Sequence, residues 1–118
     1  MEKIIRRGDI FLIDFSPSRG SQQSGLRPGV VVQCDAMNAT STKTVLVCPF
    51  TSNLRRKDFY YNTSVRNTKG NGLKKECVIL GDQLTVINTT QFKHRIGNLS
   101  ESDMRFLNRA LMTILELF

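Results

Sequence analysis

The sequence predicts a mainly β protein with one C-terminal α-helix, folded as a small antiparallel β-barrel. Short apolar runs, each bounded by Gly, Pro, Asn, Asp or Ser, follow one another along most of the chain and are typical of strands. From Ser100 onward the apolar residues recur at helical spacing instead. Several short strands followed by one helix favour a strongly bent sheet that curls into a barrel.

The expected strands differ in the strength of their signals. The run at 44–50 is rich in β-branched residues, which favour strands, whereas residues 54–75 give the weakest pattern. Turn-forming residues cluster at 35–43 and 67–72. We expect core strands at 10–15, 29–34, 44–50 and 76–80, an edge strand at 60–65, and further extended segments at 84–87 and 91–96.

The C-terminal segment has the start signal and the periodicity of an amphipathic helix. Ser100 followed by Asp103 resembles a capping box, with Asp where Glu or Gln is usual. We expect a helix from about residue 101 to about residue 116. Its apolar face would close the core of the sheet, with a homodimer interface as the alternative. That face carries Leu107, Leu111, Ile114 or Leu115, and Phe118.

Length and composition bound the class of protein. The 118 residues are expected to form one domain, 1–118, with a single core. A hydrophobic share of 40% and a charged share of 23% are ordinary for a globular protein and argue against wholesale disorder. No apolar run approaches the roughly 20 residues that span a bilayer, and the start lacks the apolar stretch of a signal peptide. We therefore expect a cytoplasmic protein that does not contact membranes.

The net charge of +7 is concentrated in the middle of the chain. Residues 39–75 hold eight basic residues against one acid, Asp58, so this stretch alone equals the net charge of the chain. A basic field of this kind favours phosphate polyanions and indicates a nucleic acid or an acidic protein as partner. Lysine-rich solvated loops are the alternative. The eight residues are Lys43, Arg55, Arg56, Lys57, Arg66, Lys69, Lys74 and Lys75.

The cysteines and the single histidine indicate no metal cofactor. Cys34, Cys48 and Cys77 are widely spaced and lie beside apolar runs, so we expect small buried side chains in a reducing compartment. No CxxC pair or Cys/His cluster is present, which argues against a zinc site. His94 lies far along the chain from Arg27 and is expected to be a solvated strand residue, with a role as general base as the alternative.

The stretch from Arg19 to Gln33, RGSQQSGLRPGVVVQ, is the most informative part of the chain. Gly20 and Gly25 bound a polar loop, and Pro28 pushes Arg27 towards an extended conformation. We expect a corner at Arg27-Pro28 that presents one guanidinium at the rim of the barrel. The alternative is an ordinary solvated arginine in a surface loop.

Three polar clusters adjoin predicted strands and together suit phosphate chemistry without a metal. A guanidinium binds phosphate oxygens in bidentate fashion, and a threonine hydroxyl can donate to a phosphate oxygen or orient a ribose 2′-OH. Held together, such groups could stabilise the transition state of 2′-OH attack on the adjacent phosphorus of RNA. The clusters are Ser21, Gln22 and Gln23 with Arg27, then Thr51 with Ser52, and then Asp82 with Gln83.

The basic run Arg55-Arg56-Lys57 and the pair Lys74-Lys75 are either solvated loops or a clamp for an RNA backbone. Phe59, Tyr60 and Tyr61 follow the first run and could stack on bases. The alternative is that some of these rings pack under the loop.

Four motifs in order resemble the MazF/PemK toxin endoribonucleases, and the resemblance covers nearly the whole chain. The motifs are RGDI at 7–10, GSQQSGLRP at 20–28, PFTS at 49–52 and CVILGDQ at 77–83. The resemblance implies an SH3-like barrel of the PemK/CcdB type that forms a homodimer. It implies metal-independent cleavage of single-stranded RNA, often mRNA, leaving 2′,3′-cyclic phosphate and 5′-OH ends. A cognate antitoxin with an acidic, partly disordered segment would hold the toxin inactive.

The resemblance also assigns roles to residues. Arg27 and Thr51 match the catalytic arginine and threonine of the family, and Asp82 lies where some members use an acid. Ser21, Gln22 and Leu80 depart from it, standing where members carry His, Glu and Arg. With fewer titratable groups, Arg27 would act in both charge stabilisation and proton transfer, or Asp82 would assist. The expected substrate-binding residues are Ser21, Gln22, Gln23, Ser52, Arg55, Arg56, Lys57 and Gln83.

Two other functions fit the same fold class. One is a gyrase-binding poison of the CcdB type, which performs no RNA chemistry. The other is a catalytically inactive barrel that binds RNA or a protein partner, for which the departures at Gln22 and Leu80 are the argument.

Overall fold

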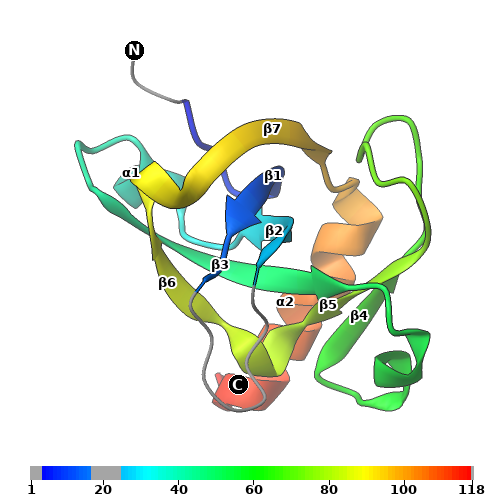
Figure 1. Ribbon diagram of the computed structural model, residues 1–118. Coiled ribbons are helices and arrows are strands. Elements are labelled where there is room, and N and C mark those ends of the chain that lie inside the picture. The colour runs from blue at the N-terminus through cyan, green and yellow to red at the C-terminus, as the bar shows by residue number, and fades with distance from the viewer. Residues whose placement is uncertain (1–3, 17–24, 118) are drawn as a thin grey trace.

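A computed structural model describes residues 4–16 and 25–117 of the chain (Figure 1). Seven strands, one long helix and several short helical turns account for most of this part. The strands are β1 (Asp9–Asp14), β2 (Leu26–Val31), β3 (Thr44–Thr51), β4 (Asn62–Val65), β5 (Cys77–Leu80), β6 (Thr85–Asn88) and β7 (Phe92–Asn98). The helices are α1 (Asp35–Asn38) and α2 (Glu101–Leu115), and the 3₁₀ turns are η1 (Leu54–Asp58), η2 (Gly81–Gln83) and η3 (Thr89–Gln91).

All strand pairs of the sheet are antiparallel, in the order β4-β5-β3-β2-β1-β7, with β6 also paired to β3. The sheet curls strongly, and β7 arches over β1 and β2 in Figure 1. Within residues 4–16 and 25–117 no pairing joins β4 to β7, so the sheet is barrel-like but not closed. The predicted fold class, a small antiparallel β structure with a C-terminal helix, is confirmed.

β5 and β6 run along the same edge of β3 and are separated by a bulge. Phe50 of β3 pairs with Ile79 of β5, and Val47 of β3 pairs with Thr85 of β6. Three steps along β3 therefore correspond to six steps along the partner segment. The three extra residues leave the ladder as the turn η2. The bulge therefore takes Asp82 out of the sheet without disturbing the pairing on either side of it.

The sheet is apolar on both faces, and each face has its own cluster of buried side chains. One cluster, which includes Ile10, Val30 and Phe50, packs against Leu107 and Leu111 of α2. The other cluster includes Phe11 and Phe92, whose tilted rings have centroids 4.9 Å apart. Alternate residues of β1 thus serve opposite cores, as the period of a strand requires.

The C-terminal helix matches its predicted signals. The Ser100 hydroxyl accepts a hydrogen bond from the Asp103 backbone N–H at 3.1 Å, which satisfies one unpaired donor at the helix start. The helix ends after Leu115, where Glu116 takes a left-handed conformation with φ of 55°. Leu107, Ala110 and Leu111 are its buried residues, which confirms that this face closes the core.

Two sequence-based expectations are wrong in the region of β2. The strand covers 26–31 rather than 29–34, so Arg27 and Pro28 belong to it and pair with Ile13 and Leu12 of β1 instead of forming a corner. Pairing with β3 begins only at Gly29, so Pro28 lies outside the stretch of the strand that bonds to β3 on that side. Past the strand, the expected turn at 35–43 begins with the short helix α1.

The cysteines are all free but differ in exposure. Cys48 and Cys77 are buried, as predicted, and burial raises the pKa of both thiols, that of Cys48 to about 12. Cys34 is exposed, contrary to prediction, because β2 ends before it and it leads into α1. In the part of the chain that the structure describes, no helix is long and apolar enough to cross a bilayer.

We predict that Cys34 is the one thiol that reacts rapidly with a disulfide reagent in the native protein near pH 8. The thiolate is the reactive form, and a raised pKa leaves Cys48 protonated at this pH. The measurement is the rate of thiol release in native and denatured protein. Cys34→Ser should remove the fast phase and leave two slow thiols, and a fast phase that survives this substitution contradicts the assignment.

Candidate active site

A groove of about 720 Å³ lies beside the start of β2 and the end of β3. It is also bounded by β1, β7 and residues 72–77. Its volume falls within the range of about 300–1,000 Å³ that is common for ligand clefts. The floor is largely apolar, with Leu12, Pro28 and Phe50 among its residues. The polar and charged lining residues are Arg27, Thr51, Ser52, Lys74, Lys75, His94 and Arg95.

The antiparallel pairing of β2 with β3 brings Arg27 and Thr51 together. The pairing ends at Gly29 opposite Pro49. Arg27 lies two positions before Gly29 on β2, and Thr51 lies two positions after Pro49 on β3. The Arg27 Nη1 donates a hydrogen bond to the Phe50 carbonyl at 3.2 Å, which holds the guanidinium beside the last residue of β3. The predicted convergence of a guanidinium and a hydroxyl is thus present in the fold.

The Thr51 hydroxyl is oriented by the turn that follows it. Its Oγ1 accepts a hydrogen bond from the Asn53 backbone N–H at 3.2 Å, so its own proton remains available to donate. Asn53 in turn caps η1 by accepting from the Arg55 N–H. Thr51 is only 9% exposed, whereas Ser52 next to it is exposed. The end of β3 therefore offers one fixed hydroxyl and one solvated hydroxyl to the groove.

The groove is electropositive because the described residues that line it include several cations and no carboxylate. Partial burial lowers the pKa of the Arg27 guanidinium, which still carries its charge at neutral pH because arginine titrates far above it. Arg95 is partly balanced by an ion pair with Asp9 at 3.3 Å. A groove with this lining suits an anion, and an apolar floor beside cations suits one that also carries a flat organic group.

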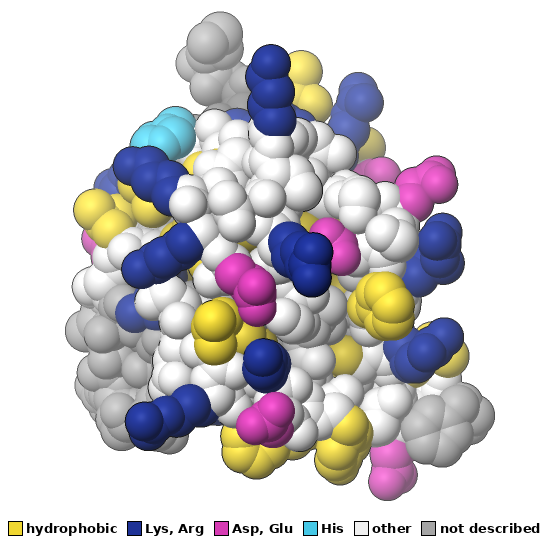
Figure 2. All heavy atoms as spheres, turned by 90° about the vertical axis from the view of Figure 1, so that its right-hand side faces the viewer, with side chains coloured by type: hydrophobic (Ala, Val, Ile, Leu, Met, Phe, Trp, Pro, Cys, Tyr) yellow, Lys and Arg dark blue, Asp and Glu magenta, His cyan; other side chains and the backbone are white. Residues whose placement is uncertain are grey.

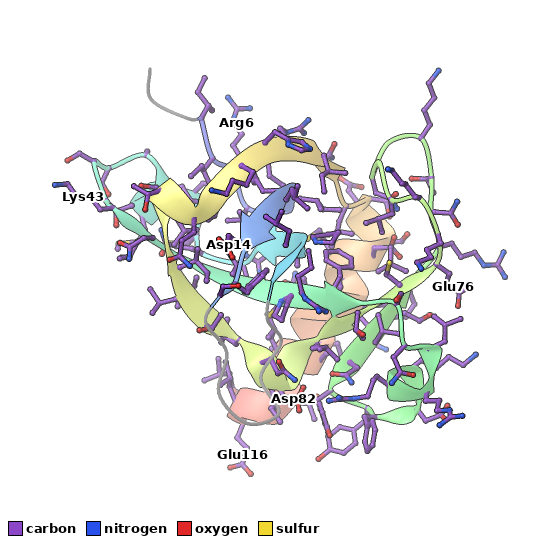
Figure 3. The ribbon with its side chains drawn as sticks, in the orientation of Figure 1. Arg6, Asp14, Lys43, Glu76, Asp82 and Glu116 are labelled. Atoms are coloured by element: carbon purple, nitrogen blue, oxygen red, sulfur yellow. The ribbon has the colours of Figure 1, made fainter. Side chains whose placement is uncertain are left out.

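Asp82 lies in a neighbouring cluster rather than in the groove lining. Its Oδ2 pairs with Arg56 Nη2 at 3.6 Å, which ties η2 to η1. Asn62 joins the same two turns, because its side chain donates to the Arg56 carbonyl and accepts from the Gly81 N–H, at 2.9 and 3.1 Å. Figure 3 shows Asp82 beneath the junction of β5 and β6, where the bulge leaves the sheet.

Three aromatic rings adjoin this cluster. The ring centroid of Tyr61 lies 5.5 Å from that of Phe59 and 5.3 Å from that of Tyr60. The Arg56 guanidinium lies 5.9 Å from the Phe59 ring. Tyr61 is half-buried, as the packing alternative expects, while Tyr60 is 75% exposed.

The predicted site residues therefore fall into three groups. Arg27, Thr51 and Ser52 line the groove. Five others lie in the η1 and η2 turns beside it: Arg55, Arg56, Lys57, Asp82 and Gln83. Ser21, Gln22 and Gln23 lie outside the described residues.

His94 is the groove residue that the sequence analysis set aside. It is exposed on β7, as expected, but it pairs with Leu12 of β1 and so returns to the groove of Arg27 despite its distance along the chain. Only the order of the strands places it there, and a single sequence does not contain that order. Lys74 and Lys75 were expected to be either solvated or a clamp for an RNA backbone and were not among the predicted site residues, and the structure places both in the groove lining.

A second cavity, of about 790 Å³, lies among the described residues between the N-terminal segment, α1 and η3. Its lining includes hydroxyl-bearing residues such as Thr40 and Thr42, and none of the predicted site residues that the structure describes contributes to it. Among residues 4–16 and 25–117, no group of three or more His, Cys, Asp or Glu side chains is placed to hold a metal ion.

Comparison with known proteins identifies the family. Residues 6–115 match the family of PemK-like, MazF-like toxins of type II toxin–antitoxin systems. The match spans most of the chain, and the chain belongs to this family. The predicted family is confirmed.

Individual relatives agree with this assignment. The endoribonuclease MazF of Staphylococcus saprophyticus is 33% identical over 108 residues, which cover 92% of this chain and 88% of the relative. The predicted enzyme class is that of this relative. The crystal structure of MazF from Deinococcus radiodurans has the same fold, with a TM-score of 0.81 at 20% identity, covering 98% of this chain and 99% of that one. A mycobacterial endoribonuclease in complex with its cognate antitoxin gives a TM-score of 0.74 at 17% identity, covering 98% and 96%.

Proposed function

We propose that this chain is the toxin of a toxin–antitoxin pair and cleaves single-stranded RNA, mRNA in particular, within the groove of Arg27 and Thr51. The ribose 2′-OH attacks the adjacent phosphorus, and the products carry 2′,3′-cyclic phosphate and 5′-OH ends. The observation that supports this proposal is the pairing of β2 with β3, which sets a charged guanidinium beside a hydrogen-bonded hydroxyl in one electropositive groove. The family assignment supports the reaction class.

The two residues divide the work of stabilising the transition state. Negative charge accumulates on the non-bridging phosphate oxygens as the 2′-oxygen bonds to phosphorus, and the Arg27 guanidinium is placed to neutralise it. The Thr51 hydroxyl donates its free proton to a phosphate oxygen or to the ribose. Because RNA supplies its own nucleophile, the chain contributes orientation and charge rather than a covalent intermediate.

Few of the described side chains that line the groove can transfer a proton. The 2′-OH must lose a proton and the leaving 5′-oxygen must gain one. Burial lowers the pKa of Arg27, which is the direction that eases proton donation to the leaving oxygen. His94 is the groove side chain of the type most often used as a general base. These groups support a reaction that uses no metal ion.

The partner and assembly are proposed on the same basis. We expect a homodimer, and a cognate antitoxin whose acidic, partly disordered segment inactivates the toxin by occupying the electropositive groove. The net charge of +7 and the cations among the described lining residues of the groove support an acidic ligand. A cytoplasmic location follows from an mRNA substrate.

Arg27→Ala is predicted to lower the cleavage rate at least about 100-fold, since it removes a preorganised charge at the phosphate. The assay incubates purified protein with a long single-stranded RNA in EDTA and maps the ends of the fragments. Arg27→Lys should recover only part of the rate, because an ammonium keeps the charge but lacks the planar pair of N–H donors that binds two phosphate oxygens in bidentate fashion. Arg105→Ala on the exposed surface of α2 is the matched control. Intact RNA with the unaltered protein, across many sequences, would exclude the proposed reaction.

Thr51→Val is predicted to lower the rate about 10- to 100-fold while keeping the fold, because valine preserves the shape of the side chain and removes its proton. Thr44→Val, at the exposed start of the same strand, should cleave like the unaltered protein. Rates at saturating RNA and thermal melting curves separate lost chemistry from lost structure. Equal rates for the two variants would remove Thr51 from the reaction.

Asp82→Asn tests the role suggested by the family. The ion pair with Arg56 places this carboxylate on η2 rather than in the groove lining, so we expect a far smaller loss of rate than for Arg27→Ala. Arg56→Ala should then cause a similar loss, since both substitutions break the same ion pair between η1 and η2. A loss for Asp82→Asn alone that equals that of Arg27→Ala would instead assign Asp82 to the reacting phosphate.

A further inference from the structure

We propose that Lys74 and Lys75 form a second phosphate subsite, which binds the RNA backbone next to the cleaved linkage. Both residues line the groove together with Arg27 and Thr51, but they come from the loop between β4 and β5. The inference rests on the proposed function, because it takes the ligand of the groove to be single-stranded RNA. It adds a site that positions the strand by its backbone and does not take part in bond breaking.

The loop that carries the two lysines is held by a buried asparagine. Asn71 is 2% exposed, and its Oδ1 accepts from the backbone N–H groups of Thr68 and Leu73 at 2.9 and 3.0 Å. Its Nδ2 donates to the Arg66 carbonyl at 2.8 Å. All three bonds are to backbone atoms of the same loop, so one side chain fixes the path of the chain immediately before Lys74.

Close backbone contact then fixes the loop against β7. Gly72 has a φ of +69°, and a Cβ at this position would overlap the carbonyl oxygen of Ile96. A Cβ at Gly97 would likewise collide with the backbone of Gly70 and Asn71. The Asn98 N–H also donates to the Gly70 carbonyl at 3.2 Å. Glycine is required at both positions for the loop to lie this near the strand.

The charge of the two lysines is not balanced by nearby acids. The ion pairs among the described residues are Arg56 with Asp82 and Arg95 with Asp9, and neither involves Lys74 or Lys75. Glu76 follows them in sequence but is not a lining residue, and Figure 3 shows it at the outer edge of the loop. A loop held by these contacts, with two lysines that line one groove and form no ion pair among the described residues, favours the binding of anions there.

Position, and not charge alone, distinguishes these lysines. Figure 2 shows Lys and Arg side chains dispersed over the face that carries this loop, with acidic side chains between them. A protein that bound RNA only by its overall charge would use all of them alike. The proposed subsite predicts instead that substituting a lysine that lines the groove weakens RNA binding more than substituting a lysine outside it.

The experiment measures binding of a fluorescent, single-stranded 2′-O-methyl oligoribonucleotide, which lacks the attacking hydroxyl and is not cleaved. Each lost phosphate contact on a single strand lowers the slope of log K against log salt by about 0.7, which near 0.1 M salt corresponds to about fivefold weaker binding. We expect this change for Lys74→Ala and for Lys75→Ala, and about twice the change in slope for the double variant. Lys74→Arg and Lys75→Arg should keep the slope of the unaltered protein.

Lys93→Ala is the matched control, because Lys93 is an exposed lysine of β7 next to His94 that does not line the groove. It removes the same charge and should leave the slope unchanged. Slopes for Lys74→Ala and Lys75→Ala that equal that of Lys93→Ala would overturn the subsite while leaving the proposed function intact. Failure of the unaltered protein both to bind this oligonucleotide and to cleave RNA would instead overturn the proposed function. Variants that bind RNA normally but lose a polyglutamate peptide would reassign the lysines to an acidic protein partner.

Discussion

The proposed function of this protein depends on the antiparallel pairing of β2 with β3. The pairing stops at Gly29 and Pro49, and the two strands continue past that point with Arg27 on one and Thr51 on the other. The hydrogen bond from Arg27 to the Phe50 carbonyl then fixes the charge beside the hydroxyl. A change of register by one residue would turn one of the two side chains to the opposite face of the sheet, so the active groups are as precisely placed as the ladder itself.

Much of the fold follows from local signals in the sequence. The short apolar runs and the capped C-terminal helix gave the element types, and the structure confirms them at most positions. The start of β2 was wrong because a corner was expected at Arg27-Pro28, whereas both residues lie in the strand, just before the stretch that pairs with β3. The exposure of Cys34 was missed because the strand ends at Val31, which leaves Cys34 at the start of α1.

The site was predictable to the extent that it lies next to single motifs. Arg27, Thr51 and Ser52 each adjoin a recognisable strand end, and the fold brings them to one groove. Asp82 also adjoins a strand, but the three-residue bulge takes it to a cluster with Arg56. His94, Lys74 and Lys75 reach the groove only through the pairing of β7 with β1 and the packing of a glycine-rich loop on β7. Such long-range contacts are not encoded in the spacing of any one segment.

The last strand of the sheet shows how charge can protect an exposed edge. β7 ends the strand order, and open edges invite other chains to add a strand of their own. Lys93 and Arg95 lie on this strand, and both are exposed. A second β7 approaching side by side would meet its own cations, so these residues oppose aggregation through the sheet. During synthesis, when several copies of the chain lie close together, the same repulsion would favour solubility.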